Sequence, residues 1–297
     1  MEYIHQQCLN GLEQEINIIN KTLNRVLESY YLNCLLDSRL FKRMFGGSFL
    51  QPSAELLHRI SLGCMNIGGG NRVQNSGERW VLDYICKANF RNQPVIVFDV
   101  GANVGDYAEE VNMRLKNGTQ IYCFEPGQQA FFSLNERFGG KNNVHVYNIG
   151  LGDKEETLTL FSEKDGASLR ASFYDLRLDH LGLEMSHLEK VKVSTIDLFC
   201  ESHGINEIDF LKLDVEGHEL KVLTGAQRML NSRQIHAIQF EFGPCNIDSR
   251  VFFRDFFYLL NSGYRIYRVL GNGLSPIESY KETYEVFITT NYLAISR

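Results

Sequence analysis

The stretch VIVFDVGANVGDY (residues 95–107) decides the class of fold. Its first six residues are apolar except for Asp99, and they predict a buried strand. A glycine turn and a predicted helix (103–116) follow at once. Glycine turns after a first strand usually hold nucleotides, because the backbone can approach the ligand there. Asp99 precedes the first glycine by two residues, and the question is which nucleotide ligand tolerates an acid at that spot.

Short β-rich runs alternate with helical runs over the rest of the chain after residue 90. The predicted strands are 95–100, 120–125, 143–149, 156–162, 190–196, 208–215, 235–242, 264–270, 284–290 and 292–297, and the predicted helices are 103–116, 127–138, 216–230 and 249–263. This alternation predicts an α/β fold with a doubly wound, mostly parallel sheet and helices on both faces. Only Asn291 separates the last two runs, so we expect a hairpin there and one antiparallel terminal strand.

The first 90 residues are interpreted as an N-terminal helical extension, and 91–297 as the main domain. Apolar residues from Leu9 to Tyr30 follow a 3–4 spacing across three heptads. This stripe favours a helix packed on its own domain, and a helix that forms a homodimer is the alternative. Glycine-containing segments in 45–79 predict loops around a short helix (53–62). We expect residues 45–80 and 163–190 to make the pocket for the acceptor.

Composition limits the classes of function. The 297 residues contain 30 Lys and Arg against 36 Asp and Glu, and the net charge of −6 argues against a general nucleic-acid binder. The seven cysteines show no C-x-x-C spacing, which is typical of a reducing compartment. The sequence shows neither a secretory signal nor an apolar run long enough to span a membrane. We therefore expect a soluble, cytoplasmic protein.

Acidic residues end four of the predicted strands. The residues at the five strand ends are Asp99, Glu125, Asn148, Asp214 and Glu241. The carboxyl ends of parallel strands open on one crevice, where ligands bind. Four carboxylates at one crevice repel one another unless a cation is bound there. The sequence therefore predicts a site for a positively charged ligand that carries ribose hydroxyls.

A dinucleotide fits the glycine turn poorly. Counted from Gly101, the G-x-G-x-x-G fingerprint needs glycines where Asn103 and Asp106 stand. Asp99 would also lie close to a doubly negative pyrophosphate. A Rossmann-type NAD-dependent oxidoreductase is therefore the weaker interpretation.

S-adenosyl-L-methionine fits better, because it has no phosphate and carries an ammonium and a sulfonium. We expect Asp99 and Asp214 to face this positive end. Gly101 and Gly105 would let the backbone approach the methionine part. Glu125 would accept hydrogen bonds from both ribose hydroxyls.

Four stretches resemble the FkbM family of S-adenosylmethionine-dependent methyltransferases. They are FDVGANVGDYA (98–108), CFEPGQQAFFSLNER (123–137), YNIGLGD (147–153) and DFLKLDVEGHELKVLTGA (209–226). The resemblance covers roughly residues 76–297, and D-V-E-G-H-E (214–219) is its most specific piece. It implies the class I methyltransferase fold and, typically, O-methylation of sugars, glycans or polyketide-type metabolites. By position it implies cofactor contacts from Asp99, Gly101, Ala102, Asn103, Gly105, Glu125, Pro126, Gly150, Leu151, Gly152 and Asp214, with 150–152 beside the adenine.

Methyl transfer to a hydroxyl depends on alignment of the reactants and gains from a general base. His218 is the first candidate, because it lies in the first turn of the predicted helix, four residues after Asp214, and imidazole titrates near neutral pH. Asp214, Glu216 and Glu241 are the alternatives, and a mechanism without a single base also stays open. The same acids and His218 could hold Mg²⁺, but the spacing does not demand it, and we predict no metal site.

Two further histidines, His180 and His187, lie in the polar insertion that is expected to face the acceptor. A catalytically silent scaffold that keeps the cofactor fold is the remaining alternative function.

Overall fold

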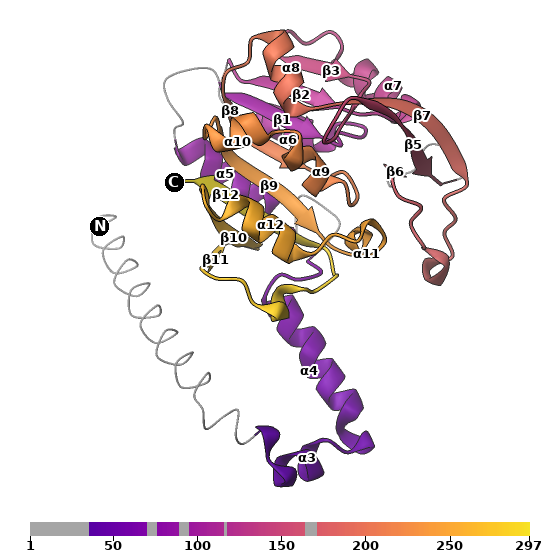
Figure 1. Cartoon of the computed structure of the whole chain (residues 1–297), viewed down its shortest axis with the longest axis vertical. Helices are drawn as coiled ribbons and strands as arrows, with labels where there is room; N and C mark the ends of the chain where they lie inside the picture. Colours follow the sequence, from indigo (N-terminus) through magenta and orange to yellow (C-terminus); the bar gives the residue numbers. More distant parts are fainter. Residues whose placement is uncertain (1–35, 70–75, 89–94, 116–117, 164–170) are drawn as a thin grey trace. The chain divides into compact units, whose positions relative to one another are not determined.

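The computed structural model describes residues 36–69, 76–88, 95–115, 118–163 and 171–297 (Figure 1). The stripe from Leu9 to Tyr30, on which the homodimer alternative rests, lies outside the described residues. The chain divides into two compact units, residues 1–61 and 62–297. In the first unit, α3 (Arg39–Phe45) is capped by Ser38, whose side chain accepts a hydrogen bond from the Phe41 amide. A 3₁₀ turn, η1 (Ser48–Leu50), leads into α4 (Gln51–Cys64), which confirms the short helix predicted at 53–62.

The second unit is built on an eight-stranded sheet. Its strands are β1 (Ile96–Val100), β2 (Gln120–Phe124), β3 (Val144–Tyr147), β8 (Ile208–Leu213), β9 (Ile235–Phe242), β10 (Tyr264–Leu270), β11 (Gly273–Ile277) and β12 (Thr290–Ser296). They follow the order β11-β10-β12-β9-β8-β1-β2-β3. Strands β3, β2, β1, β8 and β9 are parallel, and β12 runs antiparallel to both β9 and β10. The predicted α/β sheet with an antiparallel terminal strand is confirmed.

The predicted strand at 284–290 is wrong. A 3₁₀ turn, η3 (Glu282–Tyr284), occupies its start, and the hairpin near the end of the chain joins β10 and β11 instead. The Glu285 carboxylate accepts hydrogen bonds from the backbone amides of Phe253 and Arg254, at the start of α12 (Phe253–Leu260). Phe287 packs against the apolar core. The segment is largely apolar because part of it covers the core, so its composition resembles that of a strand.

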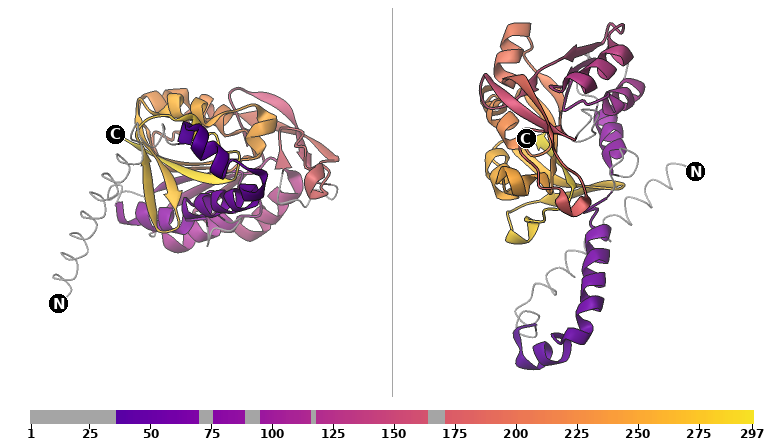
Figure 2. Two further views of the ribbon diagram at one scale, coloured as in Figure 1. Left: turned by 90° about the horizontal axis from the view of Figure 1, so that it is seen from below. Right: turned by 90° about the vertical axis from the view of Figure 1, so that its right-hand side faces the viewer.

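Helices cover both faces of the sheet (Figure 2). One face carries α5 (Glu78–Ala88), α6 (Asp106–Arg114) and α7 (Gln128–Phe138), and the other carries α8 (Ile196–His203), α9 (Glu219–Thr224), α10 (Gln227–Asn231) and α12. Val81, Leu82 and Ile85 of α5 are buried in one apolar cluster with β1 and β2. The unit that holds the sheet therefore includes α5, which the expected boundary at residue 90 assigned to the extension.

The helix predicted at 216–230 is broken and begins later. Glu216 (φ 49°) and Gly217 (φ 101°) have left-handed backbone conformations that a helix cannot continue, and α9 begins at Glu219. The helix is interrupted again after Thr224, and α10 begins at Gln227. A Cβ atom at Gly225 would overlap the carbonyl oxygen of Gly152, so this second break lets two backbone segments come together.

A smaller sheet projects from the insertion, in the order β4-β7-β5-β6. It contains β4 (Gly150–Leu151), β5 (Glu156–Ser162), β6 (Ala171–Ser172) and β7 (His187–Ser194), and the 3₁₀ turn η2 (Asp179–Leu181) lies between β6 and β7. The predicted strand 156–162 is confirmed, and the one predicted at 190–196 begins earlier. Among the described residues, we find no helix that is long and apolar enough to cross a bilayer.

Candidate functional site

A cavity of about 1670 Å³ opens at the carboxyl ends of the parallel strands. Residues at the ends of β1, β2, β8 and β9 line it, as the sequence predicted for a crevice of this fold. Ligand pockets for one small molecule usually enclose about 300–1,000 Å³. The cavity therefore has room for a cofactor and an acceptor together.

The turn between β1 and α6 lies directly on the cavity. Gly101, Ala102 and Asn103 line it, and the amides of Gly101 and Ala102 donate to the Phe124 carbonyl at 3.0 and 3.1 Å. Gly105 is not among the lining residues. A Cβ there would overlap the Phe138 ring, so its absence lets α7 pack against the turn. Gly105 thus shapes the turn from behind and does not line the cavity itself.

Glu125 follows β2 and is fixed between two turns. Its Oε2 accepts from the Asn103 amide at 2.9 Å and its Oε1 from the Gly127 amide at 2.7 Å. Burial raises the pKa of Glu125 to about 7, although both amides lower it. Glu125 and Pro126 line the cavity, and the Asn148 side chain donates to both of their carbonyl oxygens. Each carboxylate oxygen keeps a second lone pair that can accept from a ligand hydroxyl.

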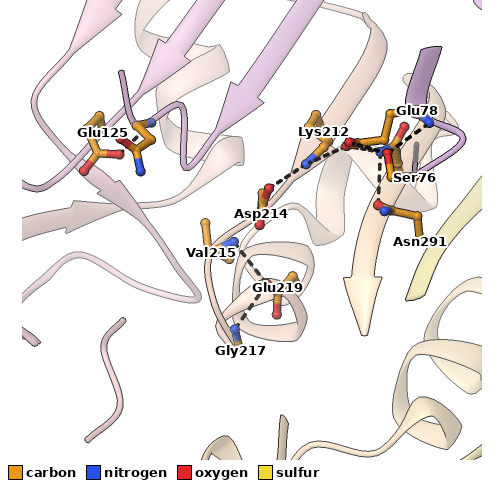
Figure 3. A network of polar contacts seen from close by, with 11 residues as sticks. Ser76, Glu78, Glu125, Lys212, Asp214, Val215, Gly217, Glu219 and Asn291 are labelled. Carbon is orange, nitrogen blue, oxygen red and sulfur yellow. Dashed lines mark hydrogen bonds and ion pairs between the residues drawn. The ribbon is translucent and has the colours of Figure 1, made fainter. Parts of the chain in front are cut away.

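The D-V-E-G-H-E segment forms a tight loop after β8 (Figure 3). The Glu219 side chain is buried, and its Oε1 accepts from the amides of Val215 (3.0 Å) and Gly217 (3.2 Å). Burial raises the pKa of Glu219 to about 7. This clamp turns Asp214 and Glu216 toward the cavity, which both of them line.

Three carboxyl groups share the cavity wall near the end of β8. They belong to Asp214, Glu216 and Glu241, and Cys245 lies beside them. The Cys245 thiol is 2.7 Å from Glu216 Oε2. Burial raises the pKa of Glu241 well above its usual value, and the charges of Asp214 and Glu216 raise it further. The structure brings together three of the four predicted catalytic residues.

His218, the fourth, lies apart from these three carboxyl groups, and its role as general base stays a prediction. Its ring is 5% exposed and is absent from the cavity lining. Nδ1 lies 3.2 Å from the Tyr174 hydroxyl, and Phe173 packs edge-on against the ring. Burial lowers the pKa of His218 to about 4. A Cβ at Gly152 would approach His218 Nε2 to 2.9 Å, so Gly152 makes room for this ring and does not line the cavity either.

Asp99 is also placed differently from the prediction. It lies within β1, 1% exposed and outside the cavity lining, on the face covered by α5 and α6. Burial raises its pKa to about 7, and the neighbouring Lys212 lowers it. Strand alternation explains the difference, because Asp99 and the last residue of β1, Val100, point to opposite faces. Asp99 therefore lies behind the cavity wall, beside Lys212.

Lys212 was missed by the sequence analysis. It is 2% exposed in β8, lines the cavity, and places Nζ 2.9 Å from Asp214 Oδ2 and 3.3 Å from Glu78 Oε1 (Figure 3). Burial alone lowers its pKa, but Asp214 and Glu78 raise the pKa well above the usual value. The signal was present, since Lys212 stands in a strand whose only other charged residue is Asp209, and buried lysines are almost always paired.

Other predicted residues meet on the insertion side of the cavity. Gly150, Leu151, His180 and His187 line it. Of the predicted acceptor segments, 163–190 contributes several lining residues from its described part, and 45–80 contributes Glu78. The described ranges contain no group of three or more His, Cys, Asp or Glu side chains able to hold a metal ion.

A family model for the FkbM methyltransferase domain matches residues 99–266, more than half of the chain. The chain belongs to the FkbM methyltransferase domain family. The members of this family are S-adenosylmethionine-dependent methyltransferases, so residues 99–266 form such a domain. The FkbM match begins at Asp99 and covers the glycine turn, Glu125 and the whole D-V-E-G-H-E segment.

Two curated proteins are similar to this FkbM chain. A 2-O-methyltransferase NoeI of Sinorhizobium fredii is 24% identical over 147 residues, which cover 46% of this chain and 58% of that protein. Methyltransferase 1 of Beauveria bassiana is 25% identical over 144 residues, which cover 43% of this chain and 57% of that protein. The chain thus spans less than two thirds of the length of either relative.

Solved methyltransferase structures are similar at low scores. One is precorrin-6y C5,15-methyltransferase from Geobacter metallireducens (TM-score 0.40, 8% identity, 73% of this chain and 88% of that one). Another is magnesium protoporphyrin IX methyltransferase from Synechocystis with bound S-adenosylmethionine (TM-score 0.37, 12% identity, 74% and 80%). TM-scores this low support no conclusion about this chain, and its assignment to the family rests on the match to the family model.

Proposed function

We propose that this protein transfers a methyl group from S-adenosyl-L-methionine to a hydroxyl of a sugar, glycan or polyketide-type metabolite. The observation that carries the proposal is the juxtaposition of the glycine turn, Glu125 and three carboxyl groups on one cavity. A cavity with this wall suits a ligand that is positive at one end and carries a ribose. The name of the NoeI relative, a 2-O-methyltransferase, supports an oxygen acceptor.

The residues present fit the cofactor. A Cβ at Gly101 would overlap the Asp214 carbonyl oxygen, so the glycine lets the turn pack directly against the loop after β8, and both segments line the cavity. Glu125 would accept from the ribose hydroxyls, and Asp214 would face the ammonium. Gly150 and Leu151 would lie beside the adenine, as the family resemblance implies. When bound, S-adenosylmethionine supplies an electrophilic methyl group on a sulfonium.

Glu241 is our choice for the general base. Asp214 is paired with Lys212, and Glu216 is in contact with the Cys245 thiol. The pKa of Glu241 is raised by burial and by these two acids, so its carboxylate takes up a proton more readily than an ordinary glutamate. A base whose pKa approaches the working pH is the more effective one. The acceptor hydroxyl would lie between Glu241 and the methyl group.

Calorimetry on the full chain tests the cofactor assignment. We expect S-adenosylmethionine and S-adenosylhomocysteine to bind and NAD to give no heat. Label transfer from methyl-labelled cofactor to a panel of nucleotide sugars, glycans and hydroxylated metabolites then tests the reaction. Binding of NAD alone would refute the proposal, and cofactor binding without transfer to any acceptor would favour a silent scaffold.

A further inference from the structure

We propose that Lys212 is a positioning residue, which holds the Asp214 carboxylate in place for the cofactor's positive end and is itself held by Glu78. The inference rests on the proposed function, because it assigns Asp214 to the cofactor. It extends the site to α5, which precedes the residues that match the family model.

The position of Lys212 follows from the register of the sheet. Lys212 on β8 pairs with Asp99 on β1 and with Gln239 on β9, so three polar side chains lie in one row across the buried face. Asp214 lies two residues further along and therefore on the same side of the chain. The Lys212 ammonium reaches its carboxylate at 2.9 Å.

Glu78 fixes the other side of the ammonium. Its Oε1 lies 3.3 Å from Lys212 Nζ and accepts from the Gln239 amide at 2.9 Å, while Oε2 accepts from Ser76 Oγ at 2.7 Å. The Gln239 amide is also 3.2 Å from Asn291 Oδ1. The Glu78 carboxylate is thus oriented by Ser76, which precedes α5, and by Gln239 of β9, whose amide also contacts Asn291 of β12 (Figure 3). A side chain held by several partners can hold Lys212 in one rotamer.

Charge explains why such an arrangement suits a cationic ligand. Around the buried Lys212 ammonium lie the carboxyl groups of Asp99, Glu78 and Asp214, and the Tyr107 ring packs on it at 5.1 Å. One ammonium cannot balance three ionised carboxylates in a poorly solvated place. A positive ligand group beside Asp214 improves this balance. Lys212 keeps Asp214 oriented before that ligand arrives, which lowers the cost of binding.

A double-mutant cycle on the full chain tests the proposal, with S-adenosylhomocysteine affinity measured by calorimetry. We expect Lys212→Met to weaken binding about tenfold or more, the usual loss for a charged hydrogen-bond partner, and Asp214→Asn to do the same. In the Asp214→Asn background, Lys212→Met should have little further effect, because Lys212 acts through Asp214. Lys212→Gln, which keeps a donor without the charge, should recover part of the loss.

Equal losses from Lys212→Met in both backgrounds would overturn the proposal, because they would indicate a general structural role. If no Lys212 variant folds, the cycle between Glu78→Gln and Asp214→Asn replaces it. These two positions meet through Lys212, so non-additive losses are expected and strict additivity would overturn the proposal. Wild-type protein that binds no S-adenosylhomocysteine would instead refute the proposed function. As the matched control, Lys190→Met on exposed β7 should leave affinity unchanged.

Discussion

The backbone at Gly101 passes so close to the carbonyl oxygen of Asp214 that a Cβ atom would overlap it. This contact joins the turn after β1 to the loop after β8, and both line the cofactor cavity. Gly101 also has φ +83°, a conformation that L side chains rarely adopt. The glycine turn after β1 and the D-V-E-G-H-E loop after β8 therefore depend on each other for their conformation.

Gly101→Ala should abolish S-adenosylhomocysteine binding and destabilise the protein by more than about 1–3 kcal/mol, the usual cost of backbone strain alone. Urea unfolding and calorimetry measure the two effects. Gly204→Ala is the matched control, since Gly204 has φ +67° but open space around a Cβ. Gly204→Ala should lower the free energy of unfolding through backbone strain, and it should leave S-adenosylhomocysteine binding unchanged. Equal behaviour of the two variants would contradict the importance of the contact with Asp214.

Glu125→Ala should weaken S-adenosylhomocysteine binding by about 1.5–3 kcal/mol, the usual value for a charged hydrogen-bond partner. The loss combines the ribose contacts with the two backbone amides that Glu125 holds. Glu136→Ala, on the exposed side of α7, is the control. Unchanged affinity in a folded Glu125→Ala protein would remove Glu125 from the ribose site.

Glu241→Gln should lower kcat by about 100-fold or more while leaving S-adenosylhomocysteine affinity nearly unchanged, as expected for loss of a general base. The comparison with His218→Ala decides between the two candidate bases. His218 lies outside the cavity lining, so a folded His218→Ala protein should keep more than about a third of the wild-type kcat, unlike a protein that has lost its base. The opposite ranking would return the role to His218.

Glu219→Gln should stabilise the ligand-free protein at alkaline pH. The folded-state pKa of Glu219, about 7, lies above its ordinary value of 4.5, so the folded protein binds the extra proton between these values. The free energy of unfolding therefore decreases as pH rises from about 4.5 through about 7. The glutamine cannot ionise, and its Oε1 can still accept from the Val215 and Gly217 amides.

Urea unfolding of both proteins from pH 4 to 8 measures this effect. Wild type and variant should be equally stable near pH 4, and the variant more stable by about 1–3 kcal/mol at pH 8. Asp99, with a pKa of about 7, contributes in the same direction, and His218, with a pKa of about 4, in the opposite direction below about pH 6.5. Both contributions are common to the two proteins and cancel in the comparison. A constant difference across the range would rule out titration of Glu219.

The sequence was sufficient for the fold class and for the residues that follow a strand directly. Residues 95–116 by themselves predict a buried strand, a glycine turn and a helix, because apolar periodicity and glycine placement are local properties. Glu125 and Asp214 were located for the same reason, since each directly follows the last residue of a strand. The strand predicted at 284–290 failed because a core-covering segment that caps α12 is as apolar as a strand.

The tertiary structure alone decided which of these side chains meet. Asp99, Lys212 and Gln239 are far apart in sequence, and the register of β1, β8 and β9 places them in one row. His218 follows Asp214 by only four residues, yet the left-handed turn at Glu216 and Gly217 directs it into the interior. Local sequence determines where strands and turns occur, because it acts over a few residues. Register and backbone handedness depend on packing between distant segments, and they determined which acids reach the cavity.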